Sequence, residues 1–182
     1  MDGTTTTGQT GTAPLHAAPQ DSPFCVTTEL AFEQPELNQL RDVWYEKAAG
    51  RPIPYRSDFD ARALKPVLRN IVILQQVLDG VLVRYRIRLM GSELTRLVGE
   101  GTGRFLDECV RPEAVPLWRA AYDAVMGAQA PLRIHTQYEA HRVNYLTSES
   151  FNAPMLDADG NASLLLSCAY FHTKSSQYEL LG

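Results

Sequence analysis

Residues 162–171 read Ala-Ser-Leu-Leu-Leu-Ser-Cys-Ala-Tyr-Phe, a run that is apolar on both sides of an extended chain. Side chains of a β-strand point alternately to its two faces. One face would carry Leu164, Leu166, Cys168 and Tyr170, and the other Leu165, Ala169 and Phe171. An antiparallel strand that is apolar on both faces needs cover on both. We therefore expect this strand to lie in the middle of a sheet, between helical layers.

The preceding chain supplies strands and helices for such a sheet. Pro35 suits a first helical position, and an apolar stripe of Leu37, Leu40, Trp44 and Ala48 recurs at helical spacing until Gly50. A second helix is predicted from Pro112 to Gly127. Asp79-Gly80 is a strong hairpin signal. Strands are predicted over 70–77, 81–89, 132–140, 143–151 and 162–171.

The strand 81–89 alternates clearly. Its pattern predicts one apolar face and one basic face, namely Val81, Val83, Tyr85, Ile87 and Leu89 against Arg84, Arg86 and Arg88. Three arginines in register resemble a row of phosphate contacts. We expect instead a solvated outer face or pairing with acidic neighbours.

This order of elements predicts an α+β domain: one five-stranded antiparallel sheet, short helices on one face and the N-terminal helix on the other. Residues 1–31 begin with a Thr-, Gly-, Pro- and Ala-rich segment and are expected to form a disordered or weakly ordered tail. The folded domain is predicted over 32–172, followed by a short C-terminal tail over 173–182.

Charge and cysteine content exclude several classes of function. The 182 residues include 17 basic and 21 acidic side chains, a net charge of −4. This balance argues against binding nucleic acid, whose phosphates must be neutralised, and no apolar run is long enough for membrane insertion. Cys25, Cys109 and Cys168 are scattered and form no metal-binding motif. We expect a cytoplasmic protein with reduced thiols and no metal site.

Several segments, in this order, resemble the PAS domain, and in particular a bacterial family from alphaproteobacteria formerly described as a domain of unknown function. The first segment comprises Trp44 and residues 50–60, followed by residues 68–71. The next two are residues 85–91 and 97–106. The last comprises Glu149, residues 153–156 and Gly160. The resemblance covers about residues 32–172 and departs at Met90 and Ala153. It implies a PAS-like sheet with its last strand beside its first, and helices enclosing a cavity against one face.

The resemblance also implies tests for built-in cofactors. A flavin-adduct photosensor of this fold needs a reactive Cys shortly before Arg-Phe-Leu, but Thr102-Gly103 precede Arg104-Phe105-Leu106 here. A haem sensor usually takes a His from the long middle helix, and 112–126 contains none. We therefore expect neither cofactor, and leave open an unidentified small ligand.

Two sets of residues are candidate sites. A ligand pocket is predicted to be lined by apolar and hydroxyl-bearing side chains: Leu89, Leu97, Phe105, Trp118, Tyr122, Tyr138 and Tyr145. A packed core without a void explains these residues equally well. A protein interface, including a homodimer contact, is predicted on the helix stripe of Leu37, Leu40 and Trp44. Packing of that stripe inside the chain is the alternative.

The function predicted from these residues is non-enzymatic, since no nucleophile–base–acid arrangement is evident. We expect a stand-alone PAS-type regulatory domain acting in bacterial signal transduction through contacts with signalling proteins, with or without a small ligand as modulator. The alternative is a dedicated small-molecule sensor with a PAS cavity.

Overall fold

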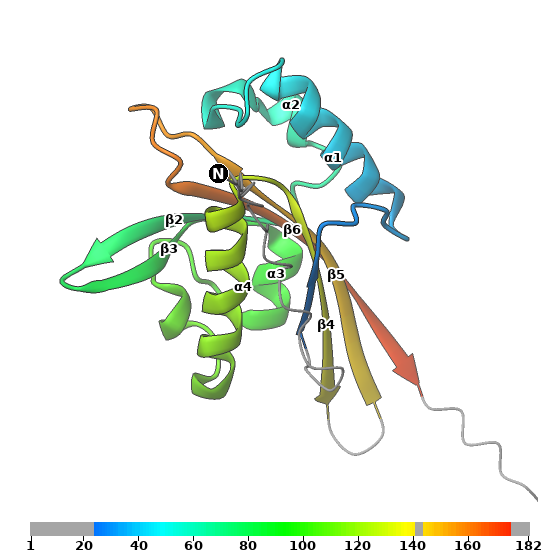
Figure 1. The fold of residues 1–182 in the computed structure, drawn as a ribbon. Helices are drawn as coiled ribbons and strands as arrows, with labels where there is room; N and C mark the ends of the chain where they lie inside the picture. The colour runs from blue at the N-terminus through cyan, green and yellow to red at the C-terminus, as the bar shows by residue number, and fades with distance from the viewer. Residues whose placement is uncertain (1–23, 141–143, 176–182) are drawn as a thin grey trace, which may run out of the picture.

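The computed structural model describes residues 24–140 and 144–175, which form a six-stranded sheet between two helical layers (Figure 1). The strand order is β1-β4-β5-β6-β2-β3, and every neighbouring pair is antiparallel. The strands are β1 Phe24–Thr27, β2 Ile71–Asp79, β3 Leu82–Met90, β4 Leu132–Ala140, β5 Asn144–Met155 and β6 Leu164–Ser175.

The last strand lies in the interior of the sheet, as its composition predicted. β6 pairs with β5 on one side and with β2 on the other. Leu166 and Cys168 of β6 belong to the buried cluster beneath α1, which we call the α1-side core. Leu165 and Ala169 belong to the cluster beneath α4, the α4-side core. Both faces of the strand are therefore covered.

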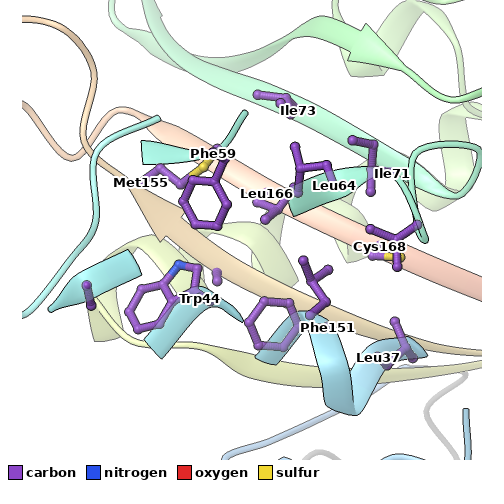
Figure 2. Packing of buried hydrophobic residues seen from close by; sticks show 14 of the residues in the cluster. Leu37, Trp44, Phe59, Leu64, Ile71, Ile73, Phe151, Met155, Leu166 and Cys168 are labelled. Carbon is purple, nitrogen blue, oxygen red and sulfur yellow. The ribbon is translucent and has the colours of Figure 1, made fainter. Parts of the chain in front are cut away.

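The α1 side of the sheet is covered by α1 (Pro35–Ala48), the 3-10 turn η1 (Arg56–Asp58) and α2 (Ala61–Leu64). Pro35 occupies the first turn of α1, and Ala49 in the left-handed conformation ends it. Figure 2 shows Trp44 and Leu37 facing Phe151, and the indole Nε1 of Trp44 donates to the backbone oxygen of Pro154 (3.0 Å). The apolar stripe of α1 thus packs on the chain's own sheet.

The opposite side is covered by α3 (Ser92–Val98), two 3-10 turns, η2 (Leu106–Glu108) and η3 (Pro112–Ala114), and α4 (Val115–Ala128). Ala121, Tyr122 and Val125 of α4 pack on Leu165 of β6 and its neighbours. Helical layers therefore lie on both faces, and the predicted fold class is confirmed. Over the ranges the structure describes, no helix is long and apolar enough to span a membrane.

The sheet has one more strand than predicted. β1 lies within the segment expected to be a weakly ordered tail, and it pairs with β4, Phe24 opposite Thr136. Phe24 is buried in the α4-side core, with its ring edge-on to Trp118 at a centroid distance of 4.8 Å. A single aromatic anchor and a free sheet edge suffice to order this short segment. At the other end, β6 runs past residue 172 to Ser175; residues 1–23 and 176–182 lie outside the described chain.

A bulge in β3 corrects the predicted alternation of that strand. Ile87 pairs with Leu74 whereas Leu89 pairs with Ile73, so Arg88 is an extra residue without a counterpart on β2. One extra residue turns the following side chains to the other face. Tyr85 and Ile87 consequently lie in the α4-side core, and Leu89 packs against the α1-side core instead of sharing their face.

Gly91 joins β3 to α3 where two backbone segments meet, and its N–H donates to the oxygen of Ile71 (2.8 Å). A Cβ atom at this position would overlap the backbone oxygens of Leu68 and Arg69. Gly91→Ala is therefore expected to lower the free energy of unfolding by about 1–3 kcal/mol, because the backbone must shift. Urea unfolding measures the loss.

Gly127 of α4 provides a matched control for that substitution, since a Cβ there would contact nothing within 4 Å. Gly127→Ala is expected to be neutral or to stabilise by up to about 1 kcal/mol, because alanine favours the helix. Equal unfolding midpoints for the two variants would show that the close approach at Gly91 is unimportant.

Candidate functional site

The structure brings together two of the seven residues predicted to line a pocket. Trp118 and Tyr122 lie on α4 with ring centroids 5.4 Å apart. Tyr122 also contacts Tyr85 of β3 (5.5 Å), and Trp118 contacts Phe24 of β1. These four rings pack against one another between α4 and the sheet. The arrangement favours the alternative reading of these two residues as core.

Three of the other five residues lie elsewhere, and the last two cannot be placed. Phe105 follows the glycine-rich loop after α3 and stacks on arginines of β3, Leu89 faces the α1-side core, and Leu97 is exposed on α3. Tyr138 and Tyr145 belong to β4 and β5, but their side chains lie outside the described part of the chain. The seven residues therefore do not form one lining, and their role in ligand binding stays a prediction.

A groove of about 260 Å³ does lie between the β2–β3 hairpin, η2 and the first turns of α4. Apolar and charged side chains alternate around it: Asp79, Leu82, Arg84, Tyr85, Leu106, Asp107, Val115 and Arg119. Only Tyr85 among these residues is fully buried. The groove is thus an open depression at the surface beside the hairpin.

Arg84 links the elements around the groove. Its guanidinium donates from Nε and Nη2 to the two carboxylate oxygens of Asp107 (3.0 and 2.8 Å), and from Nη1 to Asp79 (2.8 Å). Nη2 also lies 3.3 Å from Glu108. The hydrogen bonds from Arg84 lower the pKa of Asp107. Because three carboxylates surround this cation, Arg84 is neutralised within the chain.

Tyr85 closes the inner wall of the groove. Its hydroxyl donates to the carboxylate of Asp123 on α4 (2.6 Å) and lies 3.5 Å from the amide nitrogen of Gln76. Burial and the hydrogen bond to Asp123 raise the pKa of Tyr85. The phenol therefore remains protonated at neutral pH and ties β3 to α4.

A row of buried polar side chains lies on the α4 side of the central strands. Its members are Thr136, Ser148, Ser150, Asn152 and Ser167. The Thr136 and Ser148 hydroxyls are 2.6 Å apart, and Asn152 Nδ2 donates to Ser150 Oγ (2.9 Å). The amide oxygen of Asn152 is buried and has no protein partner within the described ranges. Such a group is costly unless water or a ligand donates to it.

A second polar centre holds the start of α1 to the sheet. The buried carboxylate of Glu149 accepts hydrogen bonds from the backbone N–H groups of Gln34 (2.7 Å) and Glu33 (3.2 Å), and from Arg133 Nη2 (3.1 Å). Burial and the neighbouring Arg133 lower the pKa of His135, whose Nε2 accepts from Arg133 (2.7 Å). Glu149 is the only charged residue in 143–156, which is the sequence signal for its role.

The predicted interface residues lie inside the chain. Leu37, Leu40 and Trp44 are exposed by 0, 2 and 1% and pack in the α1-side core. With their side chains covered by the sheet, they offer no surface to a partner protein. The structure thus supports intramolecular packing, the alternative explanation of the stripe.

Four of the exposed apolar side chains lie on the β2–β3 hairpin, which extends past α4 at the left of Figure 1. We call it the hairpin tip: Leu78, Val81, Leu82 and Val83, exposed by 71, 94, 54 and 37%. The sequence pattern predicted that Val81 and Val83 share an apolar face with Tyr85 and Ile87. One feature of the sequence could have indicated their exposure. Val81-Leu82-Val83 is apolar on both faces and comes immediately after a turn, where no helix covers the strand.

A protein-family model described as "PAS domain" matches residues 32–170. Solved structures with a similar fold include an RNA-binding Light-Oxygen-Voltage receptor (12% identity, TM-score 0.41), which covers 59% of this chain, whereas the match spans only 31% of the receptor chain. The blue-light photoreceptor Aureochrome1 LOV matches at 18% identity and TM-score 0.38, with 64% of this chain and 90% of that chain covered. No curated protein matches this sequence.

Proposed function

The chain belongs to the PAS domain family, and we propose that it acts in signal transduction by contacting another protein through its β2–β3 hairpin. PAS domains are sensory rather than catalytic modules. The signalling role of such a domain therefore depends on which of its surfaces contacts a partner protein. The fold itself does not transfer a specific partner or ligand.

One observation carries the proposal: the hairpin tip exposes four aliphatic side chains on one protruding element, with Leu78 and Val83 paired on one face and Leu82 on the other. Single exposed apolar residues are ordinary on protein surfaces, whereas contiguous patches mark interaction sites. The Arg84 ion pairs to Asp79 and Asp107 hold the hairpin on η2, so the tip is presented by a braced element. A braced surface loses little conformational entropy when it binds.

Site-specific photo-crosslinking tests this proposal. A photoreactive phenylalanine analogue at position 81, in the protein expressed in its own cells, is expected to give a discrete adduct with one protein. The same analogue at position 45 is the matched control, since Tyr45 is also exposed but lies on α1. An adduct containing two copies of this chain would identify the predicted homodimer. Absence of an adduct at position 81, or equal adducts at both positions, would contradict the proposal.

A second candidate function, detection of a small polar ligand, is favoured by Asn152. Its unpartnered amide oxygen faces the α4 side of the sheet within a row of hydroxyl groups. A donor group on a small molecule would satisfy that oxygen and displace the aromatic side chains of α4. Ligand binding there would change the position of α4, which is tied to the hairpin through Tyr85 and Asp123.

Native mass spectrometry of protein purified from its own cells checks this second candidate. We expect a bound small molecule in the wild type and its loss in Asn152→Leu, which replaces the amide by an apolar group of similar size. Without a ligand, the same variant is expected to change stability little, because loss of the hydrogen bonds from Nδ2 to Ser150 opposes the gain from removing the unpaired buried oxygen. A wild-type mass equal to the bare chain would exclude the candidate for those growth conditions.

A further inference from the structure

We infer that the partner segment bound at the hairpin is acidic: it carries a carboxylate beside aliphatic side chains. This inference rests on the proposed function and names the chemistry of the partner. The surface concerned is the α1 side of the hairpin, which we call the hairpin face and define by Val77, Leu82, Arg86 and Phe105.

The strand register brings these residues to one side. Val77 pairs with Arg84, and Leu82, Arg84 and Arg86 follow one another at alternate positions before the bulge. Phe105 forms an isolated antiparallel bridge to Arg86 and extends the surface beyond the edge of β3. None of the four residues of the hairpin face belongs to a buried cluster. The face therefore continues the sheet past the cover that α1 and α2 provide.

Two neighbouring arginines on this side differ in their charge balance. Arg84 is surrounded by three carboxylates, whereas Arg86 has no acidic partner anywhere in 24–140 or 144–175, and its buried Nε has no acceptor there. Arg88, two residues further on, is exposed and likewise has no acidic partner in those ranges. The three carboxylates are drawn to Arg84, so Arg86 and Arg88 are the guanidinium groups of this strand that remain available to a carboxylate of a partner.

Phe105 orders the cation that would bind the carboxylate. The Arg86 guanidinium carbon lies 4.8 Å from the centroid of the Phe105 ring, and that of Arg84 lies 3.7 Å from it. A stacked guanidinium has already lost part of its side-chain freedom, and its planar fork matches a carboxylate. Arginine and aromatic residues next to aliphatic ones are also the residue types that dominate binding energy at protein interfaces.

The backbone edge of β3 is occupied at Ile87 and at the oxygen of Val83, which favours contact through side chains over addition of a strand. The N–H of Ile87 donates to the oxygen of Arg104 (2.9 Å), and its oxygen accepts from Gly103 (2.7 Å). Arg119 of α4 donates to the oxygen of Val83. An edge strand with these groups paired is protected against pairing with another chain. We therefore expect the partner to contact the side chains of Leu82, Arg86 and Phe105.

Selection from a random peptide library tests the inference without knowledge of the natural partner. Sixteen-residue peptides, about the length of a short interface segment, are selected on the immobilised full chain and on Arg86→Glu. Wild type is expected to enrich Asp and Glu beside Leu, Ile or Val. The charge reversal is expected to enrich Lys and Arg instead. Arg111→Glu, which changes an exposed arginine elsewhere on the surface, is the matched control and should select the same peptides as wild type.

The affinity of one selected acidic peptide gives the size of the effect. Fluorescence anisotropy should show binding weakened about tenfold or more by Arg86→Gln, the loss expected for a hydrogen bond to a charged group. Circular dichroism of both Arg86 variants verifies that they fold, and Arg86→Gln keeps the test valid if Arg86→Glu unfolds.

The outcomes separate this inference from the proposed function. Enriched peptides without charge preference that lose affinity on Leu82→Ser would overturn the acidic partner and leave the hairpin as the contact surface. A hairpin-dependent dimer in sedimentation, with no selected peptide, would likewise replace the acidic partner by a second copy. If neither peptides nor a second copy bind and Leu82→Ser changes nothing, both the inference and the proposed function fail.

Discussion

Trp44→Ala is expected to lower the free energy of unfolding by roughly 3–5 kcal/mol, the range found for removing a large buried aromatic side chain. Trp44 is exposed by only 1% and belongs to the α1-side core. The substitution also leaves the backbone oxygen of Pro154 without its donor. Urea unfolding followed by circular dichroism at several protein concentrations measures the loss.

The concentration series distinguishes the two explanations of the α1 stripe. Intramolecular packing predicts a midpoint that does not depend on protein concentration, because folding of a monomer is unimolecular. Tyr45→Ala is the control: its side chain is half-exposed and makes an edge-to-face contact with Trp44 (5.2 Å), so a smaller loss of about 1 kcal/mol is expected. A folded, monomeric and equally stable Trp44→Ala protein would restore the interface interpretation.

Glu149→Ala is expected to destabilise the protein by a similar amount, about 3–5 kcal/mol, because it breaks a buried ion pair. The carboxylate, whose side chain is 3% exposed, is the acceptor for two backbone N–H groups before α1 and for Arg133. Its removal leaves the Arg133 guanidinium, whose side chain is only 15% exposed, without a counterion among the described residues. Hydrogen exchange should show faster exchange in α1 than in α4, because only α1 is held by this contact.

Two further variants make this prediction specific. Glu149→Gln keeps one oxygen for the backbone N–H groups but loses the charge, so a smaller loss than for alanine is expected. Glu46→Ala removes an exposed carboxylate from the same helix and should change stability by less than about 0.5 kcal/mol. Uniformly faster exchange over the whole sheet would show that Glu149 supports the core in general rather than the docking of α1.

Most strands and helices could be predicted from the spacing of apolar residues in the sequence. The both-faced apolar run of β6 predicted an interior strand, and the stripe of α1 predicted a helix packed on the sheet; both features are present. Burial enforces these patterns, because an exposed apolar face would forfeit the free energy gained by removing it from water. Pattern was weaker at the ends of elements: α4 continues through Gly127 and ends at Gln129, which adopts the left-handed conformation.

The candidate sites were predicted far less well than the fold. The sequence contained the apolar residues but did not show which of them would be covered. Leu89 changes face because of one extra residue at Arg88, and a bulge has no reliable local signature. Glu149 and Asn152 were not chosen, since a single polar residue in a strand becomes informative only when its surroundings are known.

The sequence by itself determined most of the strands and helices, the interior position of β6 and the family, because periodicity and local motifs act over a few residues. Only the tertiary structure decided which surfaces remain free. The α1 stripe and the hairpin tip are both apolar, yet the sheet covers Leu37, Leu40 and Trp44 while the tip extends beyond both helical layers. Exposure depends on what packs above a residue, and those neighbours come from distant parts of the chain.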